Sequence, residues 1–446
     1  MQQQLRQLFR LQDNEAVLVL VLGFLLLSNA LTMQISYTFS LSGFLNSSGV
    51  ASMLAVWIIN ALLSLLITAS QSLFIDRFDR KTLMKAVVLG FAGVFVLLRL
   101  LFWLDAPAWL VFGLFYITAE QQWLIFPLIF WVLANDVVNV AQAKRLFPLF
   151  ATGAFVGRIV GLVFAALAPQ FFNRLGWPLE NLTLFNMSFY VLAYVVLWRN
   201  QRKIVTRASS QRRESWRDTL SEGWHFIRDV PSFRYLSLAI LGLFVCDTII
   251  EFRFLNVSSR NFASTESYQT FYSLYRLSTV ILGFLLQAFA TSRLLERLQI
   301  KGALLVFPLT LVLGLAWMLA IPGLFSAVGA MMLFKLANST INESALKAFQ
   351  GLVPEERRGR VSMFMDSYLV SLGTMTASLL MALTLGLASW LRIEQAHYLY
   401  LSLGLLIAIG ALVAVLRMRK VYDSSLLNWR LKRRQRRGSA ALDKLM

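Results

Sequence analysis

The sequence predicts an all-α polytopic membrane protein with twelve transmembrane helices in two six-helix halves. Of its 446 residues, 58% are hydrophobic and only 15% are charged. The mean hydropathy of +0.64 agrees with this balance. Soluble domains contain about 45–50% apolar and about 25% charged residues. The composition therefore excludes an ordinary soluble fold.

Twelve apolar runs follow one another along the chain, and each is long enough to cross a bilayer, which takes about 20 helical residues. Runs of more than about 25 residues imply tilt or extension into water. The first run lacks a following small-residue cleavage site, so we interpret it as a retained helix rather than a signal peptide. The predicted spans are 16–42, 50–74, 83–104, 108–135, 147–168, 182–198, 232–255, 267–291, 302–320, 324–345, 361–386 and 397–416.

The positions of Lys and Arg predict the orientation. With the N-terminus inside, 34 of the 42 basic residues lie in inside segments and only Arg174, Arg260 and Arg392 lie in outside loops. Cytoplasmic loops carry such an excess. We therefore expect both termini in the cytoplasm and, as the location, a bacterial cytoplasmic membrane.

The longest internal loop, 199–231, divides the spans six and six. The expected domains are an N-terminal half (1–198), a cytoplasmic linker (199–231), a C-terminal half (232–416) and a basic cytoplasmic tail (417–446). In the linker, Trp216, Leu220, Trp224 and Ile227 have helical spacing among charged residues. This predicts an amphipathic helix at the cytoplasmic surface, with connecting the halves as its simplest role.

The net charge of +19 follows from the inside loops and the tail. The basic run 431–437 comes just after a spanning helix, which favours anionic lipid headgroups over nucleic acid as its partner. A single Cys (Cys246) and two distant His (His225 and His397) predict no disulfide framework and no metal site. The sequence also lacks a Gly-rich phosphate loop with Lys and a nucleophile elbow. We expect no catalytic residues, no cofactor and no enzymatic activity.

The loop between the second and third spans runs Ser72-Leu-Phe-Ile-Asp76-Arg77-Phe-Asp79-Arg80-Lys81. It resembles the signature loop of the major facilitator superfamily, with Ser72 and Asp79 in place of two glycines. The resemblance implies a major facilitator fold and a cytoplasmic latch. We expect Asp76, Arg77, Arg80 and Asp136 to form this latch, with Asp76 near Val361 and Arg80 paired with Asp136, because a carboxylate suits a helix N-terminus and Arg pairs well with carboxylates. An ordinary short basic loop is the alternative. A weaker copy of the loop at 293–301 supports an internal duplication.

Two more segments resemble the ATP:ADP antiporter branch of this superfamily, the nucleotide carriers of plastids and intracellular bacteria. The first is Phe130-Trp131-Val-Leu-Ala-Asn135-Asp136 with Ala143 to Phe150, and the second is Leu352 to Arg360 with Phe364-Met-Asp366 and Leu372-Gly373. The carriers rely on a lysine in helix 1, whereas residues 16–42 contain no Lys, Arg, Asp or Glu. The resemblance thus implies a transporter that has diverged from nucleotide exchange.

Charged residues inside spans cost about 2.5–3.5 kcal/mol each on insertion scales and face a partner or a watery cavity. We expect either complete mutual pairing or a midplane cavity in which cations bind an anionic ligand. The candidate substrate-binding residues are Asn29, Gln34, Glu120, Arg158, Arg276, Lys335 and Asn338. Tyr272 and Tyr275 precede Arg276 and fit either a ligand contact or an aromatic belt.

The tenth span carries Lys335, Asn338, Ser339, Asn342, Glu343 and Lys347 at spacings of three and four, which predicts one polar face. In the seventh span, Asp247 and Glu251 are four apart. Two close carboxylates favour binding of a proton. We therefore take Asp247, Glu251 and Glu343 as candidates for ion coupling.

Together these patterns predict a secondary transporter that works by alternating access on an organic anion, nucleotide-like or a phosphorylated metabolite. A transporter-like scaffold or assembly subunit, with a lateral protein partner, is the main alternative, and a lipid flippase is the third. The sequence leaves open the substrate, the direction of transport, the coupling ion and the oligomeric state.

Overall fold

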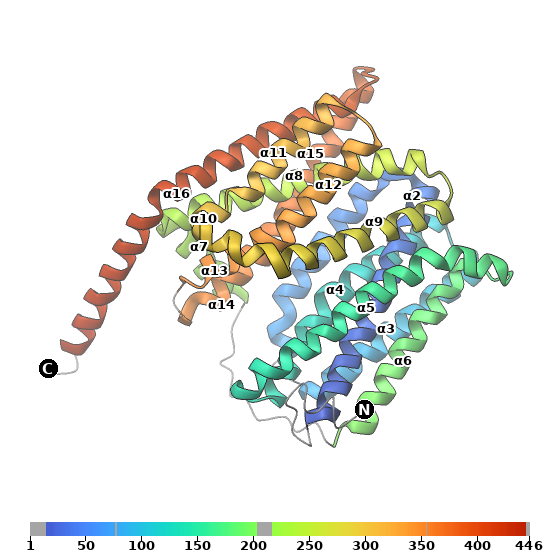
Figure 1. Ribbon diagram of the computed structural model, residues 1–446, viewed down its shortest axis with the longest axis horizontal. Helices are drawn as coiled ribbons and strands as arrows, with labels where there is room; N and C mark the ends of the chain where they lie inside the picture. Colours follow the sequence, from blue (N-terminus) through green and yellow to red (C-terminus); the bar gives the residue numbers. More distant parts are fainter. Residues whose placement is uncertain (1–14, 76–77, 203–215, 354, 443–446) are drawn as a thin grey trace. The chain divides into compact units, whose positions relative to one another are not determined.

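The computed structural model describes residues 15–75, 78–202, 216–353 and 355–442, which contain helices and connecting turns but no strand (Figure 1). Nine helical segments in this part are long and apolar enough to cross a membrane. The protein is a multi-pass membrane protein. Its chain divides into two compact units.

Unit 1 comprises residues 1–56, 66–213 and 259–280. It holds most of α2 (Glu15–Ile75), the first part of α9 (Thr265–Leu286), and the helices α3 (Arg80–Trp103), α4 (Ala108–Val137), α5 (Val140–Arg174) and α6 (Leu182–Asn200), with the short turn η1 (Leu179–Asn181) before α6.

Unit 2 comprises residues 57–65, 214–258 and 281–446. Its helices are α7 (Trp216–Asp229), most of α8 (Pro231–Asn261), α10 (Ser292–Ala303), α11 (Val306–Ala320), α12 (Leu324–Ala337), α13 (Glu343–Gln350), α14 (Glu355–Met363), α15 (Leu369–Trp390) and α16 (Ala396–Leu442). Three π-helical segments, η2 (Gln287–Thr291), η3 (Asn338–Asn342) and η4 (Phe364–Tyr368), join consecutive helices.

The described helices agree with the predicted twelve spans. The segment Glu15–Ser70 bends at Gly49, whose φ of 71° breaks α2 into two crossings. The segment Thr265–Ala320 likewise holds two crossings, with a break at Gln299, where φ is 57°. The nine segments thus contain eleven crossings, and the long helix α8 supplies the twelfth.

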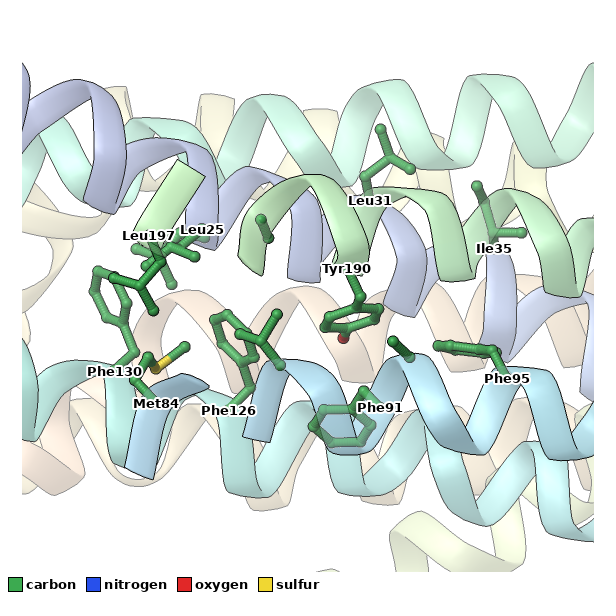
Figure 2. Packing of buried hydrophobic residues seen from close by; sticks show 14 of the residues in the cluster. Leu25, Leu31, Ile35, Met84, Phe91, Phe95, Phe126, Phe130, Tyr190 and Leu197 are labelled. Atoms are coloured by element: carbon green, nitrogen blue, oxygen red, sulfur yellow. The ribbon is translucent and has the colours of Figure 1, made fainter. Parts of the chain in front are cut away.

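Aromatic side chains fill the interior of unit 1. Tyr190 of α6 is fully buried and stacks on Phe91 and Phe95 of α3, at ring-centroid distances of 5.4 and 5.8 Å. Phe126 of α4 meets the same tyrosine edge-on (Figure 2). Lipid tails are as apolar as these rings, so the rings stabilise the helix contacts through close packing and not through removal from water. This core fixes α3, α4 and α6 around the first half of α2.

Three glycines spaced four apart bring α5 against α2. A Cβ placed on Gly153, Gly157 or Gly161 would lie 2.3, 2.4 or 2.6 Å from the main-chain oxygens of Gly23, Leu27 and Leu31, respectively. Small residues at this spacing let two membrane helices approach to backbone contact. We call these residues the glycine stripe.

Unit 2 is built with irregular turns. A π-helix bonds i to i+5 and is rare, and it occurs as single turns inside α-helices. Here each π-helical segment interrupts one long helix, at 287–291, 338–342 and 364–368. The core of unit 2 gathers around Phe233, Phe349 and Phe364.

The linker contains the predicted helix. In α7, Phe226 and Ile227 are buried in the core of unit 2, so this helix packs on protein through its apolar face. The basic tail continues helix α16 to Leu442. The predicted domain boundaries remain a prediction, since α2, α8 and α9 each contribute to both units.

Candidate functional site

Neutral polar side chains meet inside unit 1, in what we call the amide–tyrosine network. The Tyr190 hydroxyl donates to Asn29 Oδ1 at 2.7 Å and accepts from Gln122 Nε2 at 2.7 Å. Asn29 Nδ2 donates to the Gln122 carbonyl at 3.3 Å, and Gln122 Nε2 also donates to the Thr32 hydroxyl at 3.1 Å. Polar groups inside a membrane protein must be satisfied internally. The network meets most of that requirement with no charge, and only its Gln122 Oε1 atom is buried with no hydrogen-bond partner among the described residues.

These contacts bear on two residues predicted to bind substrate. Asn29 is 4% exposed and both ends of its amide are engaged by neighbours. Gln34 is 2% exposed, and its Cβ lies beside Gly161 of the glycine stripe. The structure therefore places both residues in packing between helices, and their role in ligand binding stays a prediction without support from these contacts.

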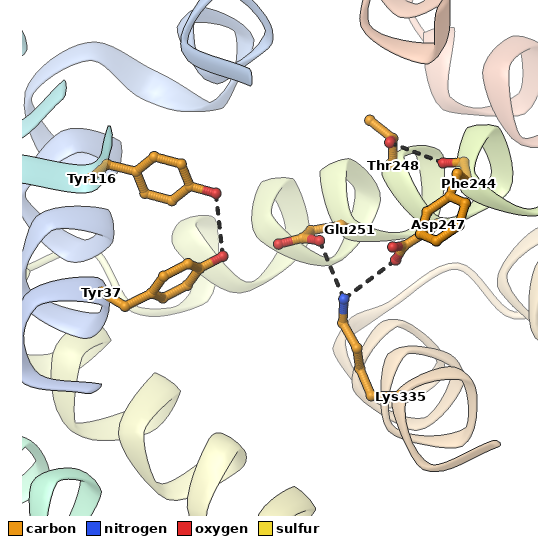
Figure 3. Close-up of polar contacts among 7 residues, drawn as sticks. All are labelled: Tyr37, Tyr116, Phe244, Asp247, Thr248, Glu251 and Lys335. Atoms are coloured by element: carbon orange, nitrogen blue, oxygen red, sulfur yellow. Dashed lines mark hydrogen bonds and ion pairs between the residues drawn. The ribbon is translucent and has the colours of Figure 1, made fainter. Parts of the chain in front are cut away.

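A second cluster of unit 1 combines an arginine with tyrosines from three helices. The guanidinium carbon of Arg276 on α9 lies 4.3 Å from the ring centroid of Tyr37 on α2. Tyr37 stacks on Tyr272 with centroids 6.2 Å apart, and its hydroxyl shares a 3.3 Å hydrogen bond with that of Tyr116 on α4 (Figure 3). We call these four residues the arginine–tyrosine cluster.

The arginine of this cluster is partly unsatisfied. Its Nη1 atom is buried and has no hydrogen-bond partner among the described residues. The Tyr37 and Tyr272 rings attract the cation through their negative faces, but a π-face does not replace an acceptor for an N–H group. Nη1 of Arg276 can therefore donate to an anionic oxygen.

A third cluster lies in unit 2. Lys335 of α12 donates from Nζ to Asp247 Oδ1 at 3.3 Å and to Glu251 Oε2 at 3.5 Å (Figure 3). Both carboxylates come from consecutive turns of α8, as their spacing of four predicts. The side chains of Asp247 and Glu251 are 18% and 16% exposed, and that of Lys335 is 36% exposed. We call these residues the lysine–carboxylate triad.

The triad tests two expectations for the membrane charges. Two carboxylates hold the ammonium group of Lys335, and its role in substrate binding stays a prediction. For these three residues the mutual pairing that the sequence left open is present.

The other predicted residues lie apart from the clusters. Arg158 lies over the Trp123 ring at 5.5 Å, and Glu120 is half-buried on α4. Asn338 accepts a 2.8 Å hydrogen bond from Asn342 within η3, and Glu343 is exposed. The polar face predicted for this span assumed uniform α-helical rotation. The winding of η3 is π-helical and not α-helical, but the side chains of Asn338 and Asn342 still contact each other across it.

At the predicted latch, Arg80 Nε lies 3.4 Å from Asp136 Oδ2, and both side chains are 13% exposed. Asp79 caps helix α3 by accepting from the Thr82 amide at 3.1 Å, which explains an acidic residue where the family motif has glycine. Asp76 and Arg77 lie outside the described residues. The latch role of this ion pair remains a prediction.

Sequence reasoning missed two features. The glycine stripe was visible as small residues four apart in α5. In unit 2, Asp366 of η4 accepts from Lys347 and, at 2.8 Å, from Gln350 Nε2. Among the described residues no group of three or more His, Cys, Asp or Glu could hold a metal ion.

Comparisons with known proteins bear on the family and the fold. Residues 132–377 match the family model described as Major Facilitator Superfamily, over more than half of the chain. The chain is 22% identical over 251 residues to ADP,ATP carrier protein 1 of Chlamydia muridarum, covering 52% of this chain and 45% of that protein. It is 25% identical over 189 residues to the chloroplastic ADP,ATP carrier protein 1 of Arabidopsis thaliana, covering 39% and 29%. The chain thus spans less than half the length of these relatives.

Solved structures share the fold at low identity. The nucleoside transporter NupG superposes with a TM-score of 0.63 at 14% identity, covering 90% of this chain and 99% of that one. A bacterial homologue of the iron transporter ferroportin, in an inward-facing state, gives a TM-score of 0.61 at 18% identity, covering 92% and 100%. At such identity the likeness concerns the fold alone.

Proposed function

The chain belongs to the major facilitator superfamily, and from this premise we propose that it is a secondary transporter that moves an organic anion by alternating access. The observation that carries the proposal is Arg276, a membrane cation that rests on Tyr37 and whose buried Nη1 atom lacks an acceptor among the described residues. A cation in a poorly solvated site needs a counter-charge. A substrate oxygen would supply it.

The arginine–tyrosine cluster also favours a particular shape of anion. The Tyr37 and Tyr272 rings lie 15° from parallel and form a stacked pair. Aromatic pairs prefer offset or edge-on contacts with a further ring. An acid that also carries a flat, π-rich group would contact the guanidinium and the edges of these rings together. The matched relatives are named ADP,ATP carriers, so adenine nucleotides are the first anions to test.

The distribution of basic residues supports an orientation in which both termini of the transporter lie on the cytoplasmic side of the membrane. We propose the bacterial cytoplasmic membrane, with anionic lipid headgroups bound at the basic loops and the tail. Lipids at these surfaces would act as partners and not as the transported anion.

The test compares anion binding by three proteins: the wild type, Arg276→Gln and the control Arg260→Gln. The control removes an exposed cation of the same unit. Purified protein is titrated with ATP, ADP, inorganic phosphate and uncharged adenosine, and the melting temperature is followed. Loss of a hydrogen bond to a charged group costs about 1.5–3 kcal/mol, so Arg276→Gln should weaken anion binding about 10- to 100-fold. Arg260→Gln should bind like the wild type.

Uptake into proteoliposomes then separates transport from binding. The proposal predicts accumulation of the bound anion and its loss in Arg276→Gln. If no organic anion in a broader screen binds the wild type, and a stoichiometric protein copurifies instead, the scaffold alternative replaces the transporter.

A further inference from the structure

A groove on unit 1 lies between the end of α5 and the start of α9. Its volume is about 570 Å³, and it is open to the surroundings of the protein. Pockets that hold small molecules have volumes of about 300–1,000 Å³. Gln269 Nε2 donates to the Ala165 carbonyl at 2.9 Å. One residue further along, the Thr270 hydroxyl donates to the Ala166 carbonyl at 3.1 Å, so the two walls of the groove are joined at its base.

The groove lies near the end of a membrane-spanning helix. Leu167 and Phe171 of α5 are apolar and exposed, as is usual for residues that face lipid tails. Just beyond the end of α5, Trp177 is also exposed, and tryptophan is enriched at the level of the lipid headgroups. In the orientation proposed above, this end of unit 1 faces the outside. The lipids beside the groove are therefore those of the outer leaflet.

Part of the lining is apolar. The rings of Phe262 and Phe271 stack with their centroids 4.3 Å apart, and Leu274 and Pro169 extend this surface. An acyl chain would fit against such a surface. However, lipid tails are as apolar as these side chains, so a chain gains little free energy by moving from the bilayer into the groove. Any preference among lipids must come from the headgroup.

The polar part of the lining carries a negative charge. Glu266 is exposed and is the one charged side chain that lines the groove in the described part of the chain. Gln170 and Asn173 add amide oxygens as further acceptors. The Ser264 hydroxyl caps α9 by accepting from the Ser267 amide at 3.1 Å. Because the cap and the nearby carboxylate offset the positive end of the helix dipole, this part of the groove favours an ammonium group over an anion.

A cation stands close to this acidic part. Arg174 is the last residue of α5 and comes four residues after Gln170, so both lie on the same face of the helix. It is exposed, and it is one of three basic residues in the outside loops, where Lys and Arg are scarce. A headgroup with a phosphate and an ammonium would meet a charge of opposite sign for each, at Arg174 and at Glu266.

We propose that this groove binds one phospholipid of the outer leaflet whose headgroup carries a primary ammonium, as in phosphatidylethanolamine. One acyl chain lies along Phe262 and Phe271, the ammonium donates to Glu266, and the phosphate contacts Arg174. The site is separate from the basic loops and the tail, which attract anionic headgroups. It goes beyond the proposed transport function and does not depend on which anion is carried.

Phosphatidylcholine is the closest competitor, because it differs only in the methyl groups on its nitrogen. Those methyl groups leave no N–H to donate to Glu266, and a hydrogen bond between two charged groups is the strong kind. Quaternary ammonium groups are bound instead by cages of aromatic faces. Phe262 and Phe271 turn one face each toward the other, with 16° between their planes, and so form a stack and not a cage.

The first experiment measures the headgroup preference. The full chain in mild detergent is given equal amounts of phosphatidylethanolamine and phosphatidylcholine with identical acyl chains, and retained lipids are identified by native mass spectrometry. The wild type should retain phosphatidylethanolamine about three- to tenfold over phosphatidylcholine. Glu266→Gln should lose this preference, and Glu394→Gln, which removes an exposed carboxylate of unit 2, should keep it. No preference in the wild type, or an unchanged one in Glu266→Gln, overturns the proposal.

The second experiment locates the lipid. A phosphatidylethanolamine with a photoactivatable acyl chain is crosslinked to the full chain in vesicles, and the labelled peptides are identified. Labelling should fall within 167–174 and 262–274. Ser267→Trp places a large side chain in the groove and should lower this labelling at least about threefold. Ser278→Trp, at an exposed position three turns further along α9, should leave it unchanged.

Three results would contradict the site. Labelling confined to other segments would place the lipid elsewhere, and labelling that persists in Ser267→Trp would show that the groove does not hold it. If a copurifying protein is crosslinked to these segments instead of the lipid, the groove is a protein interface. In the expected case, phosphatidylethanolamine should also raise the melting temperature of the wild type above its value in phosphatidylcholine, since a ligand stabilises the state that binds it. Arg174→Gln should reduce that difference.

Discussion

The two units place polar side chains in apolar helices by different means. Unit 1 uses neutral groups in the amide–tyrosine network and holds α2 against α5 through the glycine stripe. Unit 2 uses charges in the lysine–carboxylate triad and inserts three π-helical turns, a feature that the described part of unit 1 lacks. Neutral, hydrogen-bonded packing favours one arrangement, whereas paired charges and widened turns admit a second. We therefore expect unit 1 to resist change more than unit 2.

The largest contrast should come from deleting one residue in each unit. In an α-helix a deletion turns everything beyond it by about 100°, so deletion of Ile117 from α4 should prevent folding. A π-helical turn holds one residue more than an α-helical turn. Deletion of Ser339 from η3 should therefore leave an α-helix and a folded protein. Size-exclusion profiles in mild detergent measure both, and equal loss of folding would remove the contrast.

The glycine stripe should give the next effect. Gly157→Ala places a Cβ 2.4 Å from the Leu27 oxygen, so the helices must separate, at a cost of about 1–3 kcal/mol by analogy with overpacked cores. Gly90→Ala is the matched control, because a Cβ there meets nothing within 4 Å. It should raise stability by up to about 1 kcal/mol. Melting temperatures of the two variants should move in opposite directions.

Removing one hydroxyl from the amide–tyrosine network should have a moderate effect. Tyr190→Phe leaves Asn29 Oδ1 without its donor and Gln122 Nε2 without one of its acceptors. Membrane hydrogen bonds average about 0.6 kcal/mol, and unsatisfied buried groups cost about 1–3 kcal/mol, so we expect a loss of about 2 kcal/mol. Tyr194→Phe, one turn further along α6, should change stability by less than about 0.5 kcal/mol. Similar melting temperatures would show that the network contributes little.

The smallest effect on stability should follow from removing one surface charge of unit 2. Asp366→Asn weakens the contacts of this side chain with Lys347 and Gln350. These contacts are open to water, because the Lys347 and Asp366 side chains are 61% and 32% exposed. Exposed ion pairs contribute about 0–1 kcal/mol and are screened by salt. The variant should melt within about 3 °C of the wild type, by the usual conversion for larger domains. A greater fall that persists in high salt would place this cluster among the structural contacts.

The sequence predicted the fold well because its signals are long. Twelve apolar runs and the imbalance of basic residues depend on many positions at once, so no single residue decides them. The Asp247–Glu251 pair and the Arg80–Asp136 contact were also predictable, because each follows from spacing or from a motif. What these charges do in the membrane is a different question, and spacing does not answer it.

Other features depended on neighbours that are distant in sequence. Asn29 looked like a ligand residue because it is polar in an apolar span, yet Tyr190, 161 positions away, engages it. The stripe predicted for Lys335 to Lys347 assumed a uniform helical rotation, whereas the chain is π-helical through η3, although Asn338 and Asn342 still contact each other. Arguments from sequence patterns assume a uniform helical winding and do not include tertiary contacts. They are therefore unreliable where a helix is irregular or where the partner is distant in sequence.

The amide–tyrosine network has a consequence for how the chain is made. Asn29 and Tyr190 are 161 residues apart, and ribosomes add about 5–20 residues per second, so the amide waits about 8 to 32 s for its partner. During that interval the first helix must sit in the bilayer with the side-chain oxygen of Asn29 lacking its tyrosine donor, or in the shelter of the insertion machinery. Nascent chains that stop before α6 should therefore remain crosslinkable to that machinery at Asn29, and chains that include Tyr190 should be released.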